Sequence, residues 1–293
     1  MKFGAHCVLF GPEIGTNTAE VLARLAKAGA AGCELGQRFF SLDRREELTG
    51  YLSEAGIELA GLHCNELKLA DLLFAPEKAR QALLSAAEFM ASMKNKNVIA
   101  TGGIPFEEMR QRPIGEGVPI PELHQAENAR RMAEALNSIA KEAKEIWGVQ
   151  VHYHNHSWEF ADGGMLWFAL ADYAPEVQFA LDTGWAAVSG FDPLELIKRY
   201  PGRFGYIHLR DYTACQRPEE KIFSQVHEGF VTLGTGAMGY PKLLRHLEEA
   251  LGADAWAIVE YELGNFDQQS YTSALSYLHG LEDMYREIYH GEA

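Results

Sequence analysis

The segment 151–160 reads VHYHNHSWEF and combines two kinds of side chain that can do chemistry. Three imidazoles stand at alternate positions, His152, His154 and His156, and the carboxylate of Glu159 follows three residues after the last of them. Imidazole and carboxylate groups bind divalent metals, transfer protons and hydrogen-bond to substrate hydroxyls. Because alternate side chains of a β-strand point to the same face, a strand here would gather the histidines on one side.

Three later apolar segments also end in ionisable side chains. Asp182 closes VQFALD, and His208 and Arg210 share one face of FGYIHLRDY. Glu260 and Glu262 share one face of WAIVEYE. Buried ionised groups are costly unless they pair with each other or bind a cation. One aspartate, one histidine and two glutamates from four strands would form a mixed oxygen and nitrogen site, which suits Mn²⁺, Mg²⁺ or Co²⁺ better than a thiolate-rich structural zinc site does.

The elements that would position these side chains alternate regularly along the chain. Most segments between the strands have helical spacing of apolar residues, which favours a parallel sheet covered by helices. Eight such units predict an α/β fold of the (β/α)8 TIM-barrel class, with a single domain over 1–293. A doubly wound open sheet is the alternative, but no G-x-G-x-x-G follows the first strand. The predicted strands are 3–10, 32–36, 57–65, 97–103, 149–156, 177–185, 204–212 and 256–262.

Two connections are longer than the others. Segments 102–122 and 211–240 follow the fourth and seventh predicted strands, so in a barrel both lie at the C-terminal mouth, where active sites are found. We interpret them as candidate lids, with ordinary surface insertions as the alternative.

Composition narrows the classes of function. The chain has 293 residues, 47% of them hydrophobic, and a net charge of −15, which disfavours electrostatic capture of nucleic acid or of an anionic membrane surface. No apolar run has the length of a membrane span, and the first residues lack the pattern of a cleaved leader. We therefore expect a cytoplasmic protein with a small-molecule partner, no nucleic acid and no membrane, and a homo-oligomer stays open.

Five motifs taken together, HNHSWEF, ALDTGW, YIHLRD, LGTGAMGYPKLL and AIVEYE, resemble the xylose isomerase-like (β/α)8 barrels. That family includes sugar isomerases and epimerases, inosose dehydratases and, more remotely, apurinic endonucleases. The resemblance implies one divalent metal ion, Mn²⁺ first and Mg²⁺, Co²⁺ or Zn²⁺ as alternatives. The matching ligands are Glu159, Asp182, His208 and Glu260.

This sequence departs from the family pattern at two places. In the epimerases the first glutamate lies within the fifth strand, where His152 or His154 falls here, and Trp185 stands where they have a histidine. These departures leave open whether Glu159 or a histidine of the HNH segment is the fourth ligand.

The resemblance implies a metal-dependent isomerase or epimerase of a free sugar or keto-sugar. Metal-stabilised enediolate chemistry would need a pair of proton-transfer groups, and the resemblance suggests Glu159 and Glu260. A dehydratase of the inosose type is the alternative on the same site, followed by an endonuclease and by a catalytically inactive carbohydrate-binding barrel. Glu34 either reaches the mouth or forms an internal ion pair. The expected substrate-binding residues are His63, His154, His156, Trp185 and Arg210.

Overall fold

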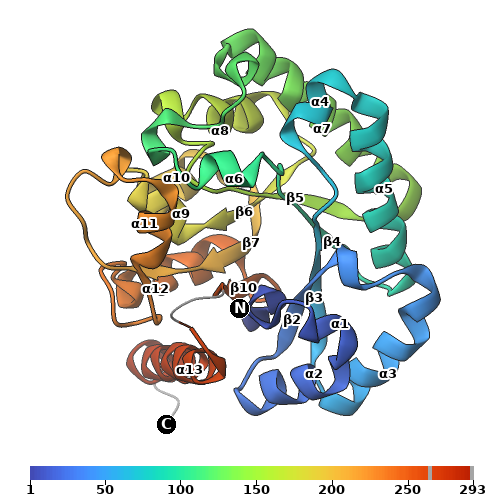
Figure 1. Cartoon of the computed structure of the whole chain (residues 1–293). Helices are drawn as coiled ribbons and strands as arrows, with labels where there is room; N and C mark the ends of the chain where they lie inside the picture. Colours follow the sequence, from blue (N-terminus) through green and yellow to red (C-terminus); the bar gives the residue numbers. More distant parts are fainter. Residues whose placement is uncertain (263–265, 291–293) are drawn as a thin grey trace.

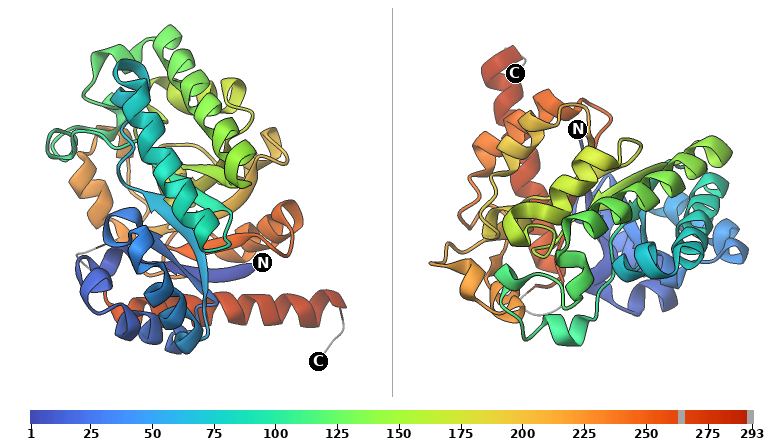
Figure 2. Two further views of the ribbon diagram at one scale, coloured as in Figure 1. Left: turned by 90° about the vertical axis from the view of Figure 1, so that its right-hand side faces the viewer. Right: turned by 90° about the horizontal axis from the view of Figure 1, so that it is seen from above.

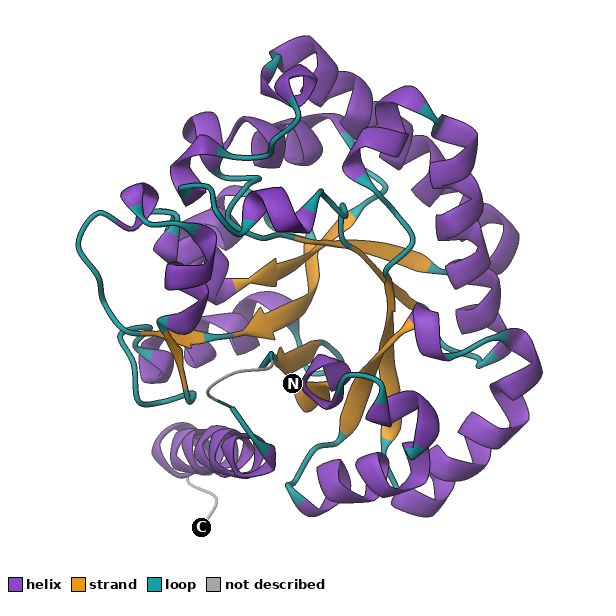
Figure 3. Cartoon of the chain, viewed as in Figure 1, coloured by secondary structure: helices purple, strands orange, loops and turns teal. Residues whose placement is uncertain are grey.

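The computed structural model describes residues 1–262 and 266–290, and its centre is a closed barrel of parallel strands (Figure 1). Eight strands follow one another around the barrel in the order β1-β10-β7-β6-β5-β4-β3-β2. Helices surround the strand ring on the outside (Figure 3), which confirms the predicted (β/α)8 fold. The strands are β1 (Lys2–His6), β2 (Gly32–Gly36), β3 (Glu58–Cys64), β4 (Asn97–Ala100), β5 (Gln150–His154), β6 (Gln178–Asp182), β7 (Phe204–Leu209) and β10 (Trp256–Val259).

Seven of these strands lie inside their predicted segments, β1 begins one residue before its segment, at Lys2, and most of the eight end earlier than predicted. The first ends at His6, whose Nδ1 accepts a hydrogen bond from the backbone N–H of Val8 and starts a short 3-10 helix. The sixth ends at Asp182, whose Oδ1 accepts the backbone N–H of Trp185 at 2.8 Å and caps helix α9. The polar residues at the strand ends thus terminate the strands themselves.

The helices between the strands bury one face against the barrel. Within α7, for example, Met132, Leu136 and Ile139 are buried, and the helix ends at Gly148 in the left-handed conformation that a glycine adopts easily. The helices are α1 (Glu13–Thr16), α2 (Thr18–Lys27), α3 (Arg45–Ala55), α4 (Leu69–Phe74), α5 (Pro76–Ser92), α6 (Phe106–Met109), α7 (Ala126–Trp147), α8 (Ala161–Tyr173), α9 (Thr183–Val188), α10 (Pro193–Arg199), α11 (Phe223–Glu228), α12 (Tyr240–Leu251) and α13 (Gln268–His290).

The last helix packs against the first strand of the chain. Helix α13 runs along the outside of the barrel (Figure 2) and contacts β1, β10 and α2. Tyr271 on this helix is fully buried, and its hydroxyl donates a hydrogen bond to the backbone carbonyl of His6. No helix among the described residues is long and apolar enough to cross a membrane.

The barrel interior is divided into an apolar lower part and a polar upper part. Six buried hydrophobic residues pack in the lower part, where the buried imidazole of His152 contacts the Tyr206 ring: Ala60, Ile99, Ala180, Tyr206, Trp256 and Ile258. Gly32 makes room for the largest of them, since a Cβ there would lie 2.5 Å from the Trp256 ring. Above this plug the interior holds ionisable side chains, so the packed layer separates the site from the N-terminal end of the barrel.

The two long connections contact each other beside the mouth. The connection 102–122 carries α6, and the connection 211–240 carries α11 and an antiparallel pair, β8 (Asp211–Tyr212) and β9 (Phe230–Val231). The backbone N–H of Ile114 donates to the backbone carbonyl of Lys221 at 3.0 Å. The backbone N–H of Phe223 donates to the backbone carbonyl of Arg112 at 2.9 Å. Their role as lids stays a prediction.

Candidate active site

Four ionisable side chains converge inside the barrel at the C-terminal ends of neighbouring strands. His154, Asp182, His208 and Glu260 each offer one potential ligand atom, and these atoms lie within 4.8 Å of one another. All four residues are buried. We call them the four-residue cluster.

Strand alternation explains why these side chains point inward. In β7, Tyr206 and His208 face the barrel interior, whereas Ile207 and Leu209 pack in the outer core against the helices. Parallel register then places Asp182 and Ile258 beside His208 on the two neighbouring strands. Glu260 follows Ile258 by two residues and shares its inward direction.

Arg210 forms ion pairs with both carboxylates of the cluster. Its Nε donates to Asp182 Oδ2 at 2.8 Å, and its Nη2 donates to Glu260 Oε1 at 2.6 Å. Burial lowers the pKa of Arg210, but the charges of Glu260, Glu262 and Asp182 outweigh it and raise that pKa overall. The guanidinium is only 1% exposed, so it is a permanent buried cation.

The pKa values of the two carboxyl groups move in opposite directions, although Arg210 lowers both of them. Burial raises the pKa of Asp182 to about 6 although Arg210 opposes the rise, and the charge of Glu260 adds to it. Burial also raises the pKa of Glu260, but Arg210 and His208 reverse this and hold it well below its usual range. Glu260 is therefore ionised at neutral pH.

His208 connects this cluster to a second one on the opposite side of the mouth. Its Nδ1 donates to Glu260 Oε2 at 2.6 Å, and its Nε2 donates to Glu34 Oε2 at 2.8 Å. Burial lowers the pKa of His208, but the two carboxylates raise it to about 10. Glu34 Oε1 in turn lies 2.9 Å from His63 Nδ1 and 3.1 Å from His6 Nε2.

His154 gives the clearest sign that the four-residue cluster can hold a metal ion. Both ring nitrogens are buried and have no hydrogen-bond partner, although Nε2 lies 3.9 Å from Glu260 Oε2. Burial and the neighbouring charge of His208 hold the pKa of His154 well below its usual value, so the ring is neutral and able to coordinate. Two imidazoles and two carboxylates fit a divalent cation, whose binding requires His208 to release one of its carboxylate partners.

Glu159 lies apart from the four-residue cluster. Its Oε1 accepts a hydrogen bond from the Tyr153 hydroxyl at 2.7 Å, and its Oε2 accepts the backbone N–H of His156 at 2.8 Å. Tyr153 belongs to the outer core between the barrel and the helices. Burial raises the pKa of Glu159 to about 7, against the effect of these hydrogen bonds. The structure therefore does not bring Glu159 together with Glu260.

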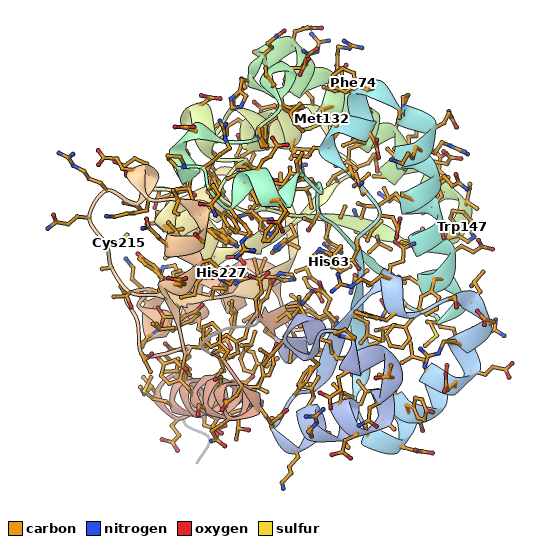
Figure 4. All side chains as sticks on the ribbon, in the orientation of Figure 1. His63, Phe74, Met132, Trp147, Cys215 and His227 are labelled. Atoms are coloured by element: carbon orange, nitrogen blue, oxygen red, sulfur yellow. The ribbon has the colours of Figure 1, made fainter. Side chains whose placement is uncertain are left out.

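Of the other predicted substrate-binding residues, His63 lies beside Glu34, and His156 and Trp185 lie among aromatic rings. His63 lies beside the mouth (Figure 4), is 8% exposed, and contacts Glu34 as described. His156 stacks on Trp158 with ring centroids 4.1 Å apart, and Trp185 stacks under Phe223 at 4.8 Å. Trp185 is fully buried and packs against the rings of His156, Phe223 and Phe230.

Sequence reasoning missed three residues that touch this network. His6 ends β1 two residues after Gly4, and the same alternation that identified His208 could have found it. Asn155 is buried and bonds through its side chain to both the backbone N–H and the carbonyl of Asp182. His227 on α11 pairs with Glu262. His227 lies within the long connection 211–240, outside the eight predicted strands, so strand alternation could not identify it.

Comparisons with known proteins agree with this architecture. Residues 22–284 match the sequence model of a family described as xylose isomerase-like TIM barrel. An inosose dehydratase of Geobacillus kaustophilus is 28% identical over 269 residues, covering 87% of this chain and 83% of that protein. One from Lacticaseibacillus casei is 25% identical over 274 residues, covering 86% and 85%. The crystal structure of a 3-keto-D-glucoside 4-epimerase from E. coli aligns with a TM-score of 0.71 at 16% identity, covering 96% of this chain and 99% of that one, and this likeness concerns the fold alone.

Proposed function

This chain belongs to the family of xylose isomerase-like TIM barrels, and from that premise we propose that it is a metal-dependent enzyme acting on a polyhydroxy ketone. The substrate is a keto-sugar or a cyclic keto-polyol. The first chemical step is the removal of a proton from the carbon next to the carbonyl group.

The observation that carries the proposal is the four-residue cluster with its unpartnered His154. A buried imidazole without any hydrogen bond is costly, and a bound cation would satisfy it. We assign His154 rather than Glu159 as the fourth ligand, beside Asp182, His208 and Glu260, because only His154 lies within reach of the other three. A divalent ion bound there supplies Lewis-acid stabilisation of the negative charge that develops on the substrate oxygen.

The side chains around this position supply proton transfer and orientation. Glu260 is ionised at neutral pH, so it is available as the base that accepts the carbon-bound proton. Arg210 fixes the Glu260 carboxylate and keeps it from rotating away. On the other side of the mouth His63, held by Glu34, can donate a proton or a hydrogen bond to a substrate oxygen.

Dehydration is the outcome that we favour after this step. Loss of a hydroxyl from the next carbon requires a base and a proton donor, and in this proposal Glu260 is the base and His63 is the donor. The relatives described above are inosose dehydratases that match most of this chain. A nuclease is disfavoured by the net charge of −15.

Epimerisation or isomerisation, expected first from the sequence, is the second candidate. It requires another base that can return the proton to a different face or carbon. Glu159 lies outside the barrel interior, and Glu34, which contacts His208 at 2.8 Å and His63 at 2.9 Å, is a second buried carboxylate for that role. The epimerase compared above has the same fold, so the fold is compatible with this reaction.

One experiment distinguishes these outcomes. Protein loaded with Mn²⁺ would be incubated in D₂O with inososes and keto-sugars and followed by proton NMR, with metal content measured by elemental analysis. We expect deuterium exchange at one carbon together with an unsaturated, dehydrated product. Exchange with an inverted stereocentre and no loss of water would identify an epimerase. Metal-loaded protein that neither exchanges nor converts any member of the panel would contradict the proposal.

A further inference from the structure

Asp211 is a buried carboxylate that the proposed reaction does not use. It follows Arg210 directly, begins the connection 211–240 and is 1% exposed. Arg210 points into the barrel, whereas the Asp211 side chain contacts the far end of its own connection. Four backbone N–H groups donate to its carboxylate at 2.9–3.0 Å, and they belong to Tyr212, Gly234, Gly236 and Met238.

These four contacts use the acceptor capacity of the Asp211 carboxylate. Oδ1 accepts the N–H groups of Tyr212 and Met238, and Oδ2 accepts those of Gly234 and Gly236. An ionised carboxylate has about four lone-pair positions, so this one has no position left for a metal ion or a substrate hydroxyl. Gly236 lies so close that a Cβ there would be 2.3 Å from Oδ1. The carboxylate therefore serves the connection itself.

Further hydrogen bonds hold the two ends of this connection together. Tyr240 ends the connection, and its hydroxyl donates to the backbone carbonyl of Arg210 at 2.8 Å. The backbone N–H of Ala237 donates to the backbone carbonyl of Tyr212 at 2.9 Å. The pairing of β8 with β9 extends this closure towards the middle of the connection. Asp211 thus lies at the base of a loop that is closed by its own backbone.

The middle of the connection packs against Arg210, which pairs with both carboxylates of the four-residue cluster. The ring of Phe230 in β9 lies 5.1 Å from Cζ of Arg210, within the range of a cation–π contact. His227 on α11 pairs with Glu262, whose carboxylate lies 3.5 Å from Arg210 Nη1. The guanidinium therefore contacts the connection as well as the carboxylates of the cluster.

Resting on the function proposed above, we propose that Asp211 is a positioning residue, which fixes the connection 211–240 as a rigid wall of the active site. This wall sets the place of the Arg210 guanidinium, and Arg210 orients the Glu260 carboxylate that accepts the substrate proton. The connection 211–240 is then a permanent part of the site and does not open and close as a lid.

Amide hydrogen exchange of the wild-type protein, followed by NMR without any ligand, tests the rigid wall independently of the reaction. We expect the amides of Gly234, Gly236 and Met238 to exchange at least about a thousandfold more slowly than those of an unfolded chain, because exposing them breaks their bonds to Asp211. Exchange at the rate of an unfolded chain would overturn the proposal.

Two substitutions remove the contact from opposite sides. Asp211→Asn keeps the size of the side chain, but an amide has a single oxygen and cannot accept four N–H groups. Gly236→Ala places a Cβ against Oδ1 and leaves the carboxylate unchanged. We expect both variants to speed the exchange of amides 234–238 by at least about tenfold and to shift the NMR signals of the His227 ring. Substrate deuterium exchange should fall by about tenfold or more, because small displacements of groups around the reacting atoms are costly.

A matched control separates a positioning role from a structural one. Asp192 caps α10, with Oδ1 accepting the backbone N–H of Leu194 at 2.8 Å, and Asp192→Asn should leave all three measurements at wild-type values. Lower thermal stability of Asp211→Asn with unchanged His227 signals and unchanged substrate exchange would show a purely structural role and overturn the proposal. Altered His227 signals and faster amide exchange, in a protein whose wild type converts no keto-sugar, would contradict the proposed function and support the wall.

Discussion

Glu260 and Glu159 are both buried glutamates near the mouth of the barrel, yet their surroundings give them opposite properties. Glu260 lies inside the barrel between Arg210 and His208, which hold its pKa well below the usual range. Glu159 lies outside it, next to Tyr153, and burial raises its pKa to about 7. Both side chains are almost completely excluded from water. Equal burial therefore produces a carboxylate in one place and a nearly half-protonated acid in the other, because only one has cations beside it.

Backbone direction separates the two residues. Glu260 continues the alternation of β10, so it points inward like Ile258. Glu159 stands in a turn five residues after His154, where strand alternation no longer applies. Its two hydrogen bonds join the outward side of β5 to the backbone of His156. Glu159 therefore links Tyr153 to the turn that follows His154.

The largest difference between the two glutamates should be seen in catalysis. Glu260→Gln keeps an oxygen that can coordinate a metal but removes the base, so we expect substrate proton exchange to fall by roughly a hundredfold or more while much of the metal is retained. Glu159→Gln should stay within about fivefold, because its side chain does not reach the cluster. Both rates would be measured by deuterium incorporation. Comparable losses in the two variants would instead support Glu159 and Glu260 as the pair of proton-transfer groups.

The next largest effect concerns stability as a function of pH. The folded-state pKa of Glu159 is raised from 4.5 to about 7, so the folded protein binds this proton more tightly than the unfolded chain. The resulting contribution is complete below pH 4.5 and is lost as the pH rises towards 7, which amounts to about 3 kcal/mol at 1.36 kcal/mol per pKa unit. Glu159→Gln should therefore gain stability relative to wild type by about this amount between pH 4.5 and 8.

Chemical denaturation of both proteins at several pH values gives this difference directly. Other titrating groups contribute to both curves and cancel in the comparison. A difference that stays constant from pH 4.5 to 8 would mean that Glu159 has an ordinary pKa and that charge, rather than burial, dominates its surroundings.

A smaller effect should distinguish the two candidates for the fourth metal ligand. His154→Gln removes one ring whose nitrogens have no other partner, and we expect the affinity for Mn²⁺ to fall by at least tenfold. Glu159→Gln should leave that affinity within about threefold. Calorimetric titration of both variants against wild type measures the two changes. If Glu159→Gln causes the larger loss, the turn after β5 rearranges when the metal binds.

The comparison also shows how much of this site the sequence could predict. Runs of apolar residues located all eight strands, and alternation within them placed Asp182, His208 and Glu260 on the inner face. Alternation continues for one residue past β10, to Glu260, whose backbone N–H still donates to the backbone carbonyl of Leu209, but it does not extend to Glu159, five residues past the end of β5. The ion pairs of Arg210 link three segments that are far apart in the chain, and no local pattern could have predicted them.

The smallest effect concerns the hydrogen bond between Tyr153 and Glu159. Tyr153→Phe removes this donor without changing the shape of the ring, and a hydrogen bond to a buried carboxyl group contributes about 1 kcal/mol to stability. The bond favours the ionised carboxylate, so its loss should raise the pKa of Glu159 further. Tyr153→Phe should consequently destabilise the protein more at pH 8 than at pH 5, and denaturation at these two pH values measures the difference. Substrate exchange should change by less than about twofold, because the bond lies on the outer side of β5. A marked loss of exchange at unchanged stability would instead link Glu159 to the chemistry inside the barrel, and the separation between the two glutamates would have no functional meaning.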